Sequence, residues 1–313
     1  MLNNAALCIV KGDKVKDIFE NKVIRILTFQ DERLSKRQLQ LDVLLLYEID
    51  PVISGNKWFK LKYYLQDAQV KGFNKIGTFG GAYSNHIVAA AKACSMLNLS
   101  VKGVIRGEEP QQLSTTLQEA KELGMELHFV SRTDYKDKEE IKQLFPYHYW
   151  INEGGYGMLG ANGAGDILRL IKDIQSYSHI VLAVGTGTTF AGIVEASLPM
   201  QEVIGISVLK NNAALETDVY ALLSEEARKK KYSLLHDFHF GGYAKSSLEL
   251  FDFMNELWLK QGIPTDFVYT AKALKAIFTL NEQEKLPEGS RILFIHTGGL
   301  QGNRSLPKET LMF

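Results

Sequence analysis

Short apolar runs of strand length alternate along this chain with stretches of helical periodicity. Gly, Asn or charged residues bound the runs, and several are rich in β-branched side chains. Runs without polar alternation are typical of parallel strands buried on both faces. Repeated strand–helix alternation predicts an α/β fold with mainly parallel sheets flanked by helices. We expect strands at Val43–Tyr47, Ile76–Phe79, Val101–Ile105, Leu127–Val130, Ile180–Val184, Val203–Val208 and Ile292–Ile295.

Charge and composition exclude several classes of function. Lys and Arg number 36, and so do Asp and Glu, which argues against a general nucleic-acid or anionic-membrane binder. No apolar stretch reaches the roughly 18 residues needed to span a bilayer. The apolar patch within Met1–Val10 has no basic flank, so it is not typical of a signal peptide. We expect a cytoplasmic protein with neither nucleic-acid nor membrane partners.

Cysteine and histidine usage argues against disulfides and metal. Cys8 and Cys94 are the only cysteines of the sequence, which gives no disulfide framework and no cysteine-rich zinc site. The seven histidines show no metal-binding spacing, and we expect no metal.

Three helices can be placed with some detail. Ser246 and Glu249 have the spacing of a capping box, and apolar residues then recur at helical spacing to Trp258. Gln112–Leu123 and Ala271–Leu280 also have helical patterns.

In open parallel sheets, ligands bind beyond the carboxyl ends of the strands, so the loops after apolar runs are where chemistry is expected. The first such loop is Ser54–Lys57, which opens a helix to about Val70. The positive end of the helix dipole and partial burial would favour a neutral lysine amine, as a Schiff-base lysine requires. A capping turn with an exposed lysine is the alternative.

The second loop is Gly80–His86, which opens a helix to about Leu97. Its main-chain N–H groups, with the Ser84 and Asn85 side chains, could hold a substrate carboxylate. A plain helix N-cap is the alternative. His86 could act as an acid or base, although a lone histidine on a helix is more often structural.

The third loop, Gly185–Thr189, and the fourth, Thr297–Gly299, also follow apolar runs. Small residues and threonine hydroxyls in the third loop favour a phosphate monoester. A dinucleotide is disfavoured because Phe190 stands where the third glycine of that motif belongs. A tight strand–helix turn is the alternative. The fourth loop is weak evidence when taken alone.

Taken together, these loops resemble the family of 1-aminocyclopropane-1-carboxylate deaminases and D-cysteine desulfhydrases. Those enzymes depend on pyridoxal 5'-phosphate (PLP) and share the fold type II, tryptophan-synthase-β-like architecture. The motifs follow the family's order from about residue 40 to 305. They are Gly55-Asn56-Lys57 with Lys60, Gly80-Gly81 with Ser84-Asn85-His86, Gly185–Thr189, Tyr243, Tyr269-Thr270 and Thr297-Gly298-Gly299.

The resemblance implies a role for each motif. Lys57 would form the Schiff base with PLP and shuttle protons, and Asn56 would bond the phenolic oxygen of the cofactor. Gly185, Thr186, Gly187, Thr188 and Thr189 would cradle the phosphate, with Thr270 and Thr297 also at the cofactor. Ser84, Asn85 and His86 would bind substrate, and Ser84 could assist proton transfer. Tyr243 and Tyr269 would line the substrate side and take part in catalysis.

Two positions bear on the reaction. Members that open the cyclopropane ring carry Glu and Leu where this chain has Thr270 and Thr297, whereas desulfhydrases carry hydroxyl residues. A carboxylate at the pyridine nitrogen makes a deeper electron sink than a hydroxyl. The resemblance therefore favours α,β-elimination of a small D-amino acid, most simply D-cysteine, to pyruvate, ammonia and sulfide. Opening of 1-aminocyclopropane-1-carboxylate to 2-oxobutanoate and ammonia is the first alternative, and a non-catalytic PLP-binding protein is the second.

The resemblance also implies an architecture and an assembly. We expect a large PLP-binding domain of residues 1–61 and 163–313, with a small α/β domain of residues 62–162 inserted in it, and a homodimer. One departure is that Trp58 and Phe59 follow the lysine where the family commonly has Arg at the second position. We expect both near the cofactor entrance, where they would affect substrate preference.

Overall fold

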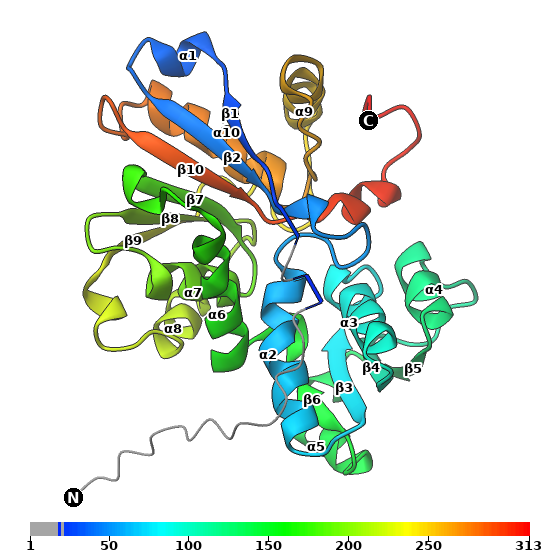
Figure 1. The fold of residues 1–313 in the computed structure, drawn as a ribbon. Coiled ribbons are helices and arrows are strands. Elements are labelled where there is room, and N and C mark those ends of the chain that lie inside the picture. Colours follow the sequence, from blue (N-terminus) through cyan, green and yellow to red (C-terminus); the bar gives the residue numbers. More distant parts are fainter. Residues whose placement is uncertain (1–17, 20–21) are drawn as a thin grey trace, which may run out of the picture.

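The computed structural model describes residues 18–19 and 22–313. The apolar patch within Met1–Val10 and Cys8 lie outside these residues. The described part contains a six-stranded and a four-stranded sheet, and helices cover both (Figure 1). The prediction of an α/β fold with mainly parallel sheets is therefore confirmed. None of the helices in the described ranges is long and apolar enough to cross a membrane.

The larger sheet has the strand order β1-β2-β10-β7-β8-β9. Its neighbours pair in parallel except β1, an edge strand that runs antiparallel to β2. All six residues of β7 are buried, and alternate residues face two different hydrophobic clusters, which explains the continuous apolar run. The strands are β1 Ile26–Phe29, β2 Gln40–Leu45, β7 His179–Val184, β8 Glu202–Ser207, β9 Lys231–Leu235 and β10 Arg291–His296.

The smaller sheet has the order β5-β4-β3-β6, and all its pairs are parallel. Its strands are β3 Lys75–Gly80, β4 Ser100–Arg106, β5 Met125–Val130 and β6 Tyr149–Ile151. The carboxyl ends of β3, β7 and β10 lead into the glycine-rich loops that the sequence singles out.

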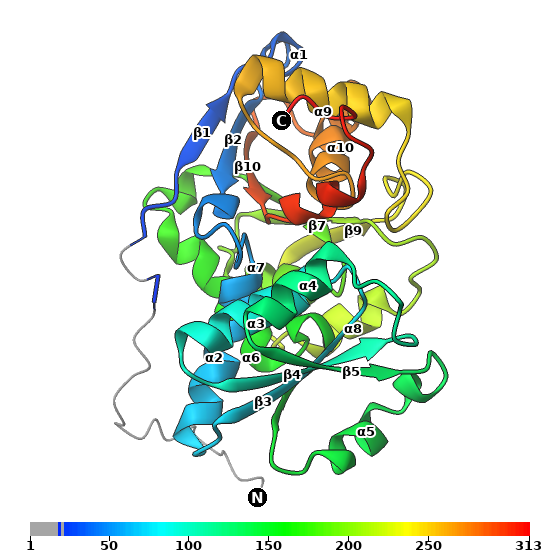
Figure 2. The ribbon, with the colours of Figure 1, turned by 90° about the vertical axis from the view of Figure 1, so that its right-hand side faces the viewer.

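Helices lie on both faces of each sheet. In the larger sheet, α9 and α10 cover one face and α6, α7 and α8 the other (Figure 1). In the smaller sheet, α3 and α4 lie on one face and α5 on the other (Figure 2). The helices are α1 Glu32–Ser35, α2 Lys57–Val70, α3 Asn85–Met96, α4 Thr115–Glu122, α5 Lys138–Leu144, α6 Met158–Gly165, α7 Thr188–Ala196, α8 Leu215–Ala221, α9 Leu248–Gln261 and α10 Thr270–Glu282.

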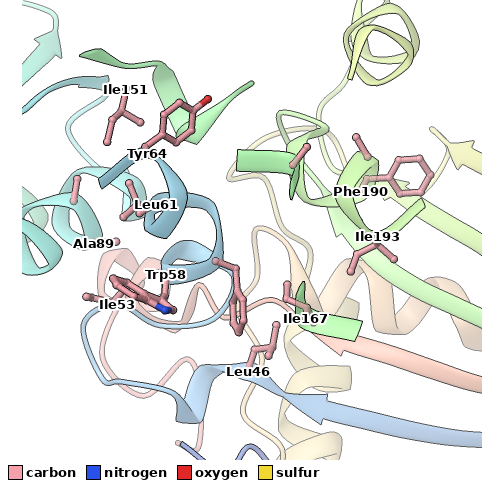
Figure 3. Close-up of a cluster of buried hydrophobic side chains, with 14 of the residues drawn as sticks. Leu46, Ile53, Trp58, Leu61, Tyr64, Ala89, Ile151, Ile167, Phe190 and Ile193 are labelled. Carbon is pink, nitrogen blue, oxygen red and sulfur yellow. The ribbon is translucent and has the colours of Figure 1, made fainter. Parts of the chain in front are cut away.

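The helix α2 lies in the hydrophobic core between the two sheets (Figure 3). Half of its residues are buried, including Trp58 and Phe59, which are 1% and 4% exposed. Both side chains are thus packed in the core, and the expectation that they lie near the cofactor entrance and affect substrate preference stays a prediction. The main-chain oxygen of Phe59 also packs so closely on α6 that a Cβ at Gly163 would lie 1.9 Å from it.

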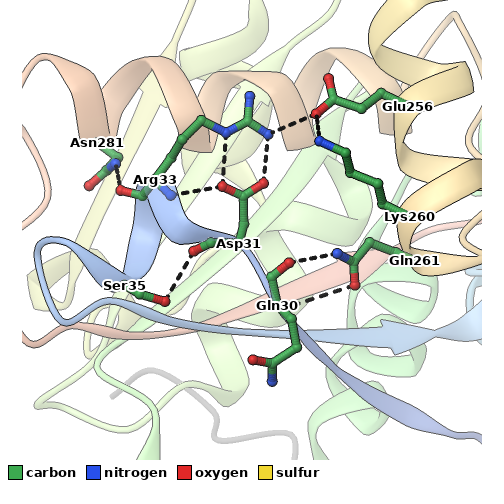
Figure 4. Close-up of polar contacts among 8 residues, drawn as sticks. All are labelled: Gln30, Asp31, Arg33, Ser35, Glu256, Lys260, Gln261 and Asn281. Carbon is green, nitrogen blue, oxygen red and sulfur yellow. Dashed lines mark hydrogen bonds and ion pairs between the residues drawn. The ribbon is translucent and has the colours of Figure 1, made fainter.

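Polar contacts fasten the edge strand and α1 to the helices α9 and α10 (Figure 4). Asp31 caps α1, accepting from the main-chain N–H of Arg33 at 2.9 Å and from its guanidinium at 2.6 Å. The Gln261 amide donates to the main-chain oxygen of Gln30 at 2.6 Å, and that of Asn281 to Arg33 at 2.9 Å. These two bonds satisfy main-chain oxygens of the segment that follows β1 and of α1, and tie that segment to α9 and α10.

Several sequence predictions need correction at their ends. The strand expected at Val43–Tyr47 ends at Leu45, because a 3-10 helix, Leu46–Glu48, begins there. The cap of α9 is Ser247, whose hydroxyl accepts from Leu250 N at 3.3 Å, and not Ser246. Three strands, β1, β6 and β9, were not predicted. The expected domain boundaries near 61 and 162 fall inside α2 and α6, and the division into domains stays a prediction.

Candidate active site

Two of the four loops meet through their main chains. Asn56 N donates to Thr297 O at 3.1 Å. A Cβ at Gly55, where φ is +69°, would lie 1.9 Å from that same oxygen, so only glycine fits this crossing. Gly298 also packs closely on this crossing, because a Cβ there would lie 2.8 Å from Gly55 Cα. The contact fixes the start of α2 against the carboxyl end of β10.

A chain of side-chain hydrogen bonds links this crossing to the third loop. The Lys57 amine donates to Asn56 Oδ1 at 2.6 Å, and Asn56 Nδ2 donates to Thr189 Oγ1 at 2.7 Å. Asn56 is thus oriented by two partners from different parts of the sequence. Lys57, Asn56 and the Gly185–Thr189 loop, which the sequence places in one site, are brought together.

Burial lowers the pKa of Lys57 to about 8, and the carboxylate of Asp266 opposes this effect. One helical turn on, Lys60 is 5% exposed, and burial, followed by the charge of Lys57, lowers its pKa well below the usual value. The Lys60 side chain has no hydrogen-bond or ion-pair partner among the described residues. Two neighbouring amines with depressed pKa values favour a bound anion or carbonyl group beside them.

The Gly185–Thr189 loop opens α7 with its amides and hydroxyls close together. Gly187 is the N-cap with φ +79°, and a Cβ there would lie 2.7 Å from Val219 Cγ2. The Thr186 and Thr188 hydroxyl oxygens are 3.3 Å apart. Free N–H groups at the start of a helix, together with clustered hydroxyls, are suited to bind a phosphate group.

The strand β6 contributes a further loop, Glu153–Gly155, which the sequence analysis missed. A Cβ at Gly154 would lie 3.0 Å from Thr186 Cγ2, and one at Gly155 would lie 3.2 Å from Lys60 Cβ. Both glycines have positive φ, at 65° and 71°. The loop therefore brings Lys60 and the Gly185–Thr189 loop together. Two consecutive glycines after a strand could have indicated this loop, but β6 has only three residues and was not predicted.

Ser84 and Asn85 lie at the N-terminus of α3, where the second loop ends. Ser84 is the N-cap, yet its hydroxyl makes no capping bond, and a Cβ at Gly80 would lie 3.0 Å from it. Both side chains are half-buried and have no hydrogen-bond partner in the described part of the chain. They are therefore available to an anionic ligand.

His86 is buried beneath that loop, away from the exposed Tyr83. Its Nε2 lies 2.8 Å from Thr78 Oγ1, which donates to Ile151 O at 2.9 Å. Nε2 therefore carries the proton. Burial, reinforced by the charges of Lys60 and Lys57, lowers the pKa of His86 to about 3, so the ring is neutral. These contacts suit a residue that supports the loop, and the predicted substrate contact of His86 gains no support from them.

Tyr243 and Tyr269 pack edge to face, and Tyr269 lies against Gly185. The ring centroids of Tyr243 and Tyr269 are 6.2 Å apart at 74°, and a Cβ at Gly185 would lie 3.2 Å from Tyr269 Cε1. Burial raises the pKa of both phenols, that of Tyr269 well above its usual value. Both phenols are thus protonated at neutral pH and suit a binding or donor role better than that of a base.

Thr270 is fully buried and hydrogen-bonded to Asp266, a residue that the sequence analysis did not single out. The Thr270 hydroxyl donates to Asp266 Oδ1 at 2.7 Å and accepts from Asp266 N at 2.8 Å. The carboxylate also accepts from the N–H groups of Val268, Tyr269 and Thr270 at 3.0, 2.8 and 2.9 Å. Both of its oxygens are therefore occupied at the start of α10.

Comparison with known proteins decides the family. The family model described as "Pyridoxal-phosphate dependent enzyme" matches residues 30–298. The chain belongs to this family. Within the matched range lie all the residues of the site described above except Gly299, and the cofactor of the enzyme is PLP. Because the matched family is one of enzymes, the alternative of a non-catalytic PLP-binding protein is set aside.

Individual relatives place the enzyme more closely. A protein of Pyrococcus horikoshii named "Putative 1-aminocyclopropane-1-carboxylate deaminase" is 31% identical over 80% of this chain and 81% of its own length. A protein of Arabidopsis thaliana named "Bifunctional D-cysteine desulfhydrase/1-aminocyclopropane-1-carboxylate deaminase, mitochondrial" is 30% identical over 80% and 70%. A crystal structure of an "ACC deaminase homologue", where ACC stands for 1-aminocyclopropane-1-carboxylate, superimposes with a TM-score of 0.75, at 26% identity over 90% of both chains. This PLP-dependent lyase therefore belongs with the deaminases and desulfhydrases.

The donor set of the site fits PLP. Amides and hydroxyls at the start of α7 suit a phosphate, and the two neighbouring amines of lowered pKa suit reaction with a carbonyl group. The Asp266 carboxylate accepts four hydrogen bonds from residues 268–270, so it takes none of the donors of the Gly185–Thr189 loop away from a phosphate.

Proposed function

We propose that the enzyme eliminates the side-chain thiol of D-cysteine, producing pyruvate, ammonia and hydrogen sulfide with the uptake of one water. The observation that carries the proposal is the Lys57 amine, which Asn56 holds at 2.6 Å and whose pKa is lowered to about 8. Such an amine is partly neutral at physiological pH and is able both to bind PLP covalently and to accept a proton.

The residues that would hold PLP follow from the loops. When bound, PLP supplies an electron sink that stabilises negative charge at the substrate Cα. Lys57 would be the covalent attachment, and Asn56, Thr270 and Thr297 would lie around the ring. The phosphate would bind to Gly185, Thr186, Gly187, Thr188 and Thr189, with the Lys60 amine as a neighbouring hydrogen-bond donor.

The remaining residues would bind and orient the amino acid. Ser84 and Asn85, whose side chains are unoccupied, would receive its carboxylate at the N-terminus of α3. Tyr243 and Tyr269 would close the substrate side. Because the pKa of both phenols is raised, Lys57 is the better base for the α-proton, and a phenol could protonate the leaving thiolate.

The thiol rather than the cyclopropane substrate is supported by Thr270. Residue 270 carries a hydroxyl, and four hydrogen bonds occupy the carboxylate of the neighbouring Asp266, so the position offers no free carboxylate. A hydroxyl gives a weaker electron sink than a carboxylate, which is sufficient for a good leaving group such as thiolate. The names of the relatives favour the second candidate, 1-aminocyclopropane-1-carboxylate deamination to 2-oxobutanoate, as strongly as the first.

The test of the proposal is product identification with purified, PLP-loaded enzyme. D-cysteine, L-cysteine and 1-aminocyclopropane-1-carboxylate are offered separately, and pyruvate, 2-oxobutanoate and sulfide are measured. We expect pyruvate and sulfide in equal amounts from D-cysteine. Release of 2-oxobutanoate alone would replace the proposal with the second candidate, and no keto acid from any of them would place the substrate elsewhere.

Replacing Thr270 with Glu and Thr297 with Leu together is expected to move activity toward 1-aminocyclopropane-1-carboxylate. The new carboxylate would deepen the electron sink, and the leucine would remove a hydroxyl. Both positions are buried, so the larger side chains should also cost about 1–3 kcal/mol of stability. The measurement is the ratio of 2-oxobutanoate to pyruvate release, with each single variant as a control. An unchanged ratio in a folded double variant would remove these residues as determinants.

The rate should rise with pH through about 8. Burial lowers the pKa of Lys57 to about 8, and only its neutral amine accepts a proton, so the active fraction grows as the pH passes that value. The measurement is kcat between pH 6 and 9.5 at saturating substrate. A rate that falls across this interval would contradict the role of Lys57 as the base.

The assembly and the compartment are further proposals. We propose a homodimer, following the family resemblance, and a cytoplasmic location, following the composition of the sequence. Size-exclusion chromatography with light scattering gives the molar mass, and a monomer at micromolar concentration would overturn the dimer.

A further inference from the structure

Lys272 is a fully buried lysine near the N-terminus of α10, at 0% exposure. Its ammonium donates to two main-chain oxygens, those of His239 at 2.9 Å and Gly242 at 2.8 Å. Burying a lysine costs several kcal/mol, and the positive end of a helix adds to that cost. An apolar side chain of the same length would avoid both costs, so the two hydrogen bonds are what this lysine contributes.

The two oxygens belong to consecutive turns of the loop between β9 and α9. His239 O also accepts from Gly242 N at 3.0 Å, and Gly242 O accepts from Lys245 N at 3.2 Å. Lys272 thus joins the first residues of both turns at one point. Tyr243, a predicted substrate-side residue, lies within the second turn.

The backbone of this loop is strained around Tyr243. Phe240 and Ala244 have φ of 49° and 53°, a conformation that is unfavourable for residues with a Cβ. Gly241 and Gly242 have φ of 91° and 117°. Strained conformations persist where surrounding contacts hold them, and they cluster at functional sites. The buried ammonium is such a contact.

Tyr243 itself has little else to fix it. Its side chain is 49% exposed, and its ring contacts Tyr269 edge to face. The Tyr269 ring packs against Gly185 of the phosphate-binding loop. The position of the Tyr243 ring therefore depends on the loop backbone that carries it and on this contact with Tyr269.

We propose that Lys272 is a positioning residue that holds Tyr243 at the substrate side by fastening the two turns of residues 239–245. The inference rests on the proposed function for the role of Tyr243, and on the hydrogen bonds alone for the fastening of the loop. Burial lowers the pKa of Lys272 to about 8, partly offset by the Asp266 carboxylate. Ammonium and neutral amine both donate hydrogen bonds, so the fastening holds on either side of that pH.

Hydrogen exchange tests the fastening without any substrate. In Lys272→Met, the amides of Gly242 and Lys245 should exchange about tenfold faster, since one lost hydrogen bond of about 1.4 kcal/mol corresponds to that factor. The matched control is Lys230→Met, because Lys230 also donates to main-chain oxygens, those of Val194, Glu195 and Ser197 at 3.2, 2.6 and 2.8 Å. If these two amides exchange at the same rate in Lys272→Met as in the wild-type protein, the proposal is overturned.

A double-mutant cycle tests the role of the fastening. We expect Lys272→Met to raise KM for D-cysteine about tenfold while kcat falls less than threefold, and to add nothing in a Tyr243→Ala background. An equal loss in that background would overturn the positioning role, because a general structural defect acts without Tyr243. If Lys272→Met does not fold by circular dichroism, Lys272→Gln, which keeps one donor group, replaces it with the same two criteria. Absence of turnover by the wild-type enzyme would count against the proposed function, whereas the exchange result would still decide the fastening.

Discussion

Lys57→Ala is expected to reduce keto-acid release by at least about 10³-fold, the range expected when a nucleophile and base is lost. The Lys57 amine donates a hydrogen bond to Asn56 Oδ1 at 2.6 Å, and this contact orients the amine. The measurement is pyruvate release from D-cysteine by PLP-loaded protein. The control is Lys62→Ala, a substitution on the same helix that removes a lysine whose amine forms an ion pair with Asp166 at 2.6 Å.

The same variant separates binding from chemistry. The hydroxyls and amides of the Gly185–Thr189 loop are untouched in Lys57→Ala, so PLP should still bind without covalent attachment. Dialysis should then remove PLP from the variant but not from the wild-type protein, with absorbance as the readout. Full activity in Lys57→Ala would show that another lysine does the chemistry.

Asp266→Ala is expected to produce the largest loss of stability among the site residues. Its carboxylate is fully buried and accepts three main-chain N–H bonds and one hydroxyl bond, all of which the change leaves open. Hydrogen bonds to a charged group contribute about 1.5–3 kcal/mol each, and buried donors without partners are costly. We expect a loss of about 3 kcal/mol or more, seen as a fall in Tm of roughly 5 °C.

Two further measurements make this prediction specific. Asp137, an exposed carboxylate that caps α5 through Glu140 N at 3.0 Å, gives the matched control, and Asp137→Ala should cost only about 1 kcal/mol. Asp266 also opposes the lowering of the pKa of Lys57, so its removal should shift the rising limb of the rate profile to lower pH. An Asp266→Ala protein as stable as the Asp137 variant would contradict this account.

The fold could be predicted from the sequence wherever strands are buried on both faces. β7 and β10 are of this kind, and their apolar runs place the strands to within a residue or two. The missed strands carry weaker signals. β9 begins inside the charge run Arg228–Lys231, β6 has three residues, and β1 is an edge strand of partly exposed side chains.

The site could be predicted in its loops but not in its connections. The sequence singled out Lys57 and Thr189 in separate loops. Only the fold shows that the Asn56 side chain hydrogen-bonds both, its neighbour Lys57 and Thr189, which is 133 residues away. Asp266 and Lys272 gave no signal, since a lone carboxylate and a lone lysine near a helix start are ordinary surface residues in sequence. Burial turns them into main-chain anchors. Trp58 and Phe59 show the same limit, because the sequence did not reveal that both side chains are packed in the core.

The central claim is that Lys57, and not another lysine, carries PLP. Burial lowers the pKa of four described lysines, namely Lys57, Lys60, Lys230 and Lys272, so more than one amine could react with PLP. The most direct measurement is borohydride reduction of the PLP-loaded enzyme, followed by peptide mass spectrometry with fragmentation. The account predicts a pyridoxyl-phosphate group on Lys57 alone. The same group on Lys60 or Lys272, with Lys57 unmodified, would contradict it.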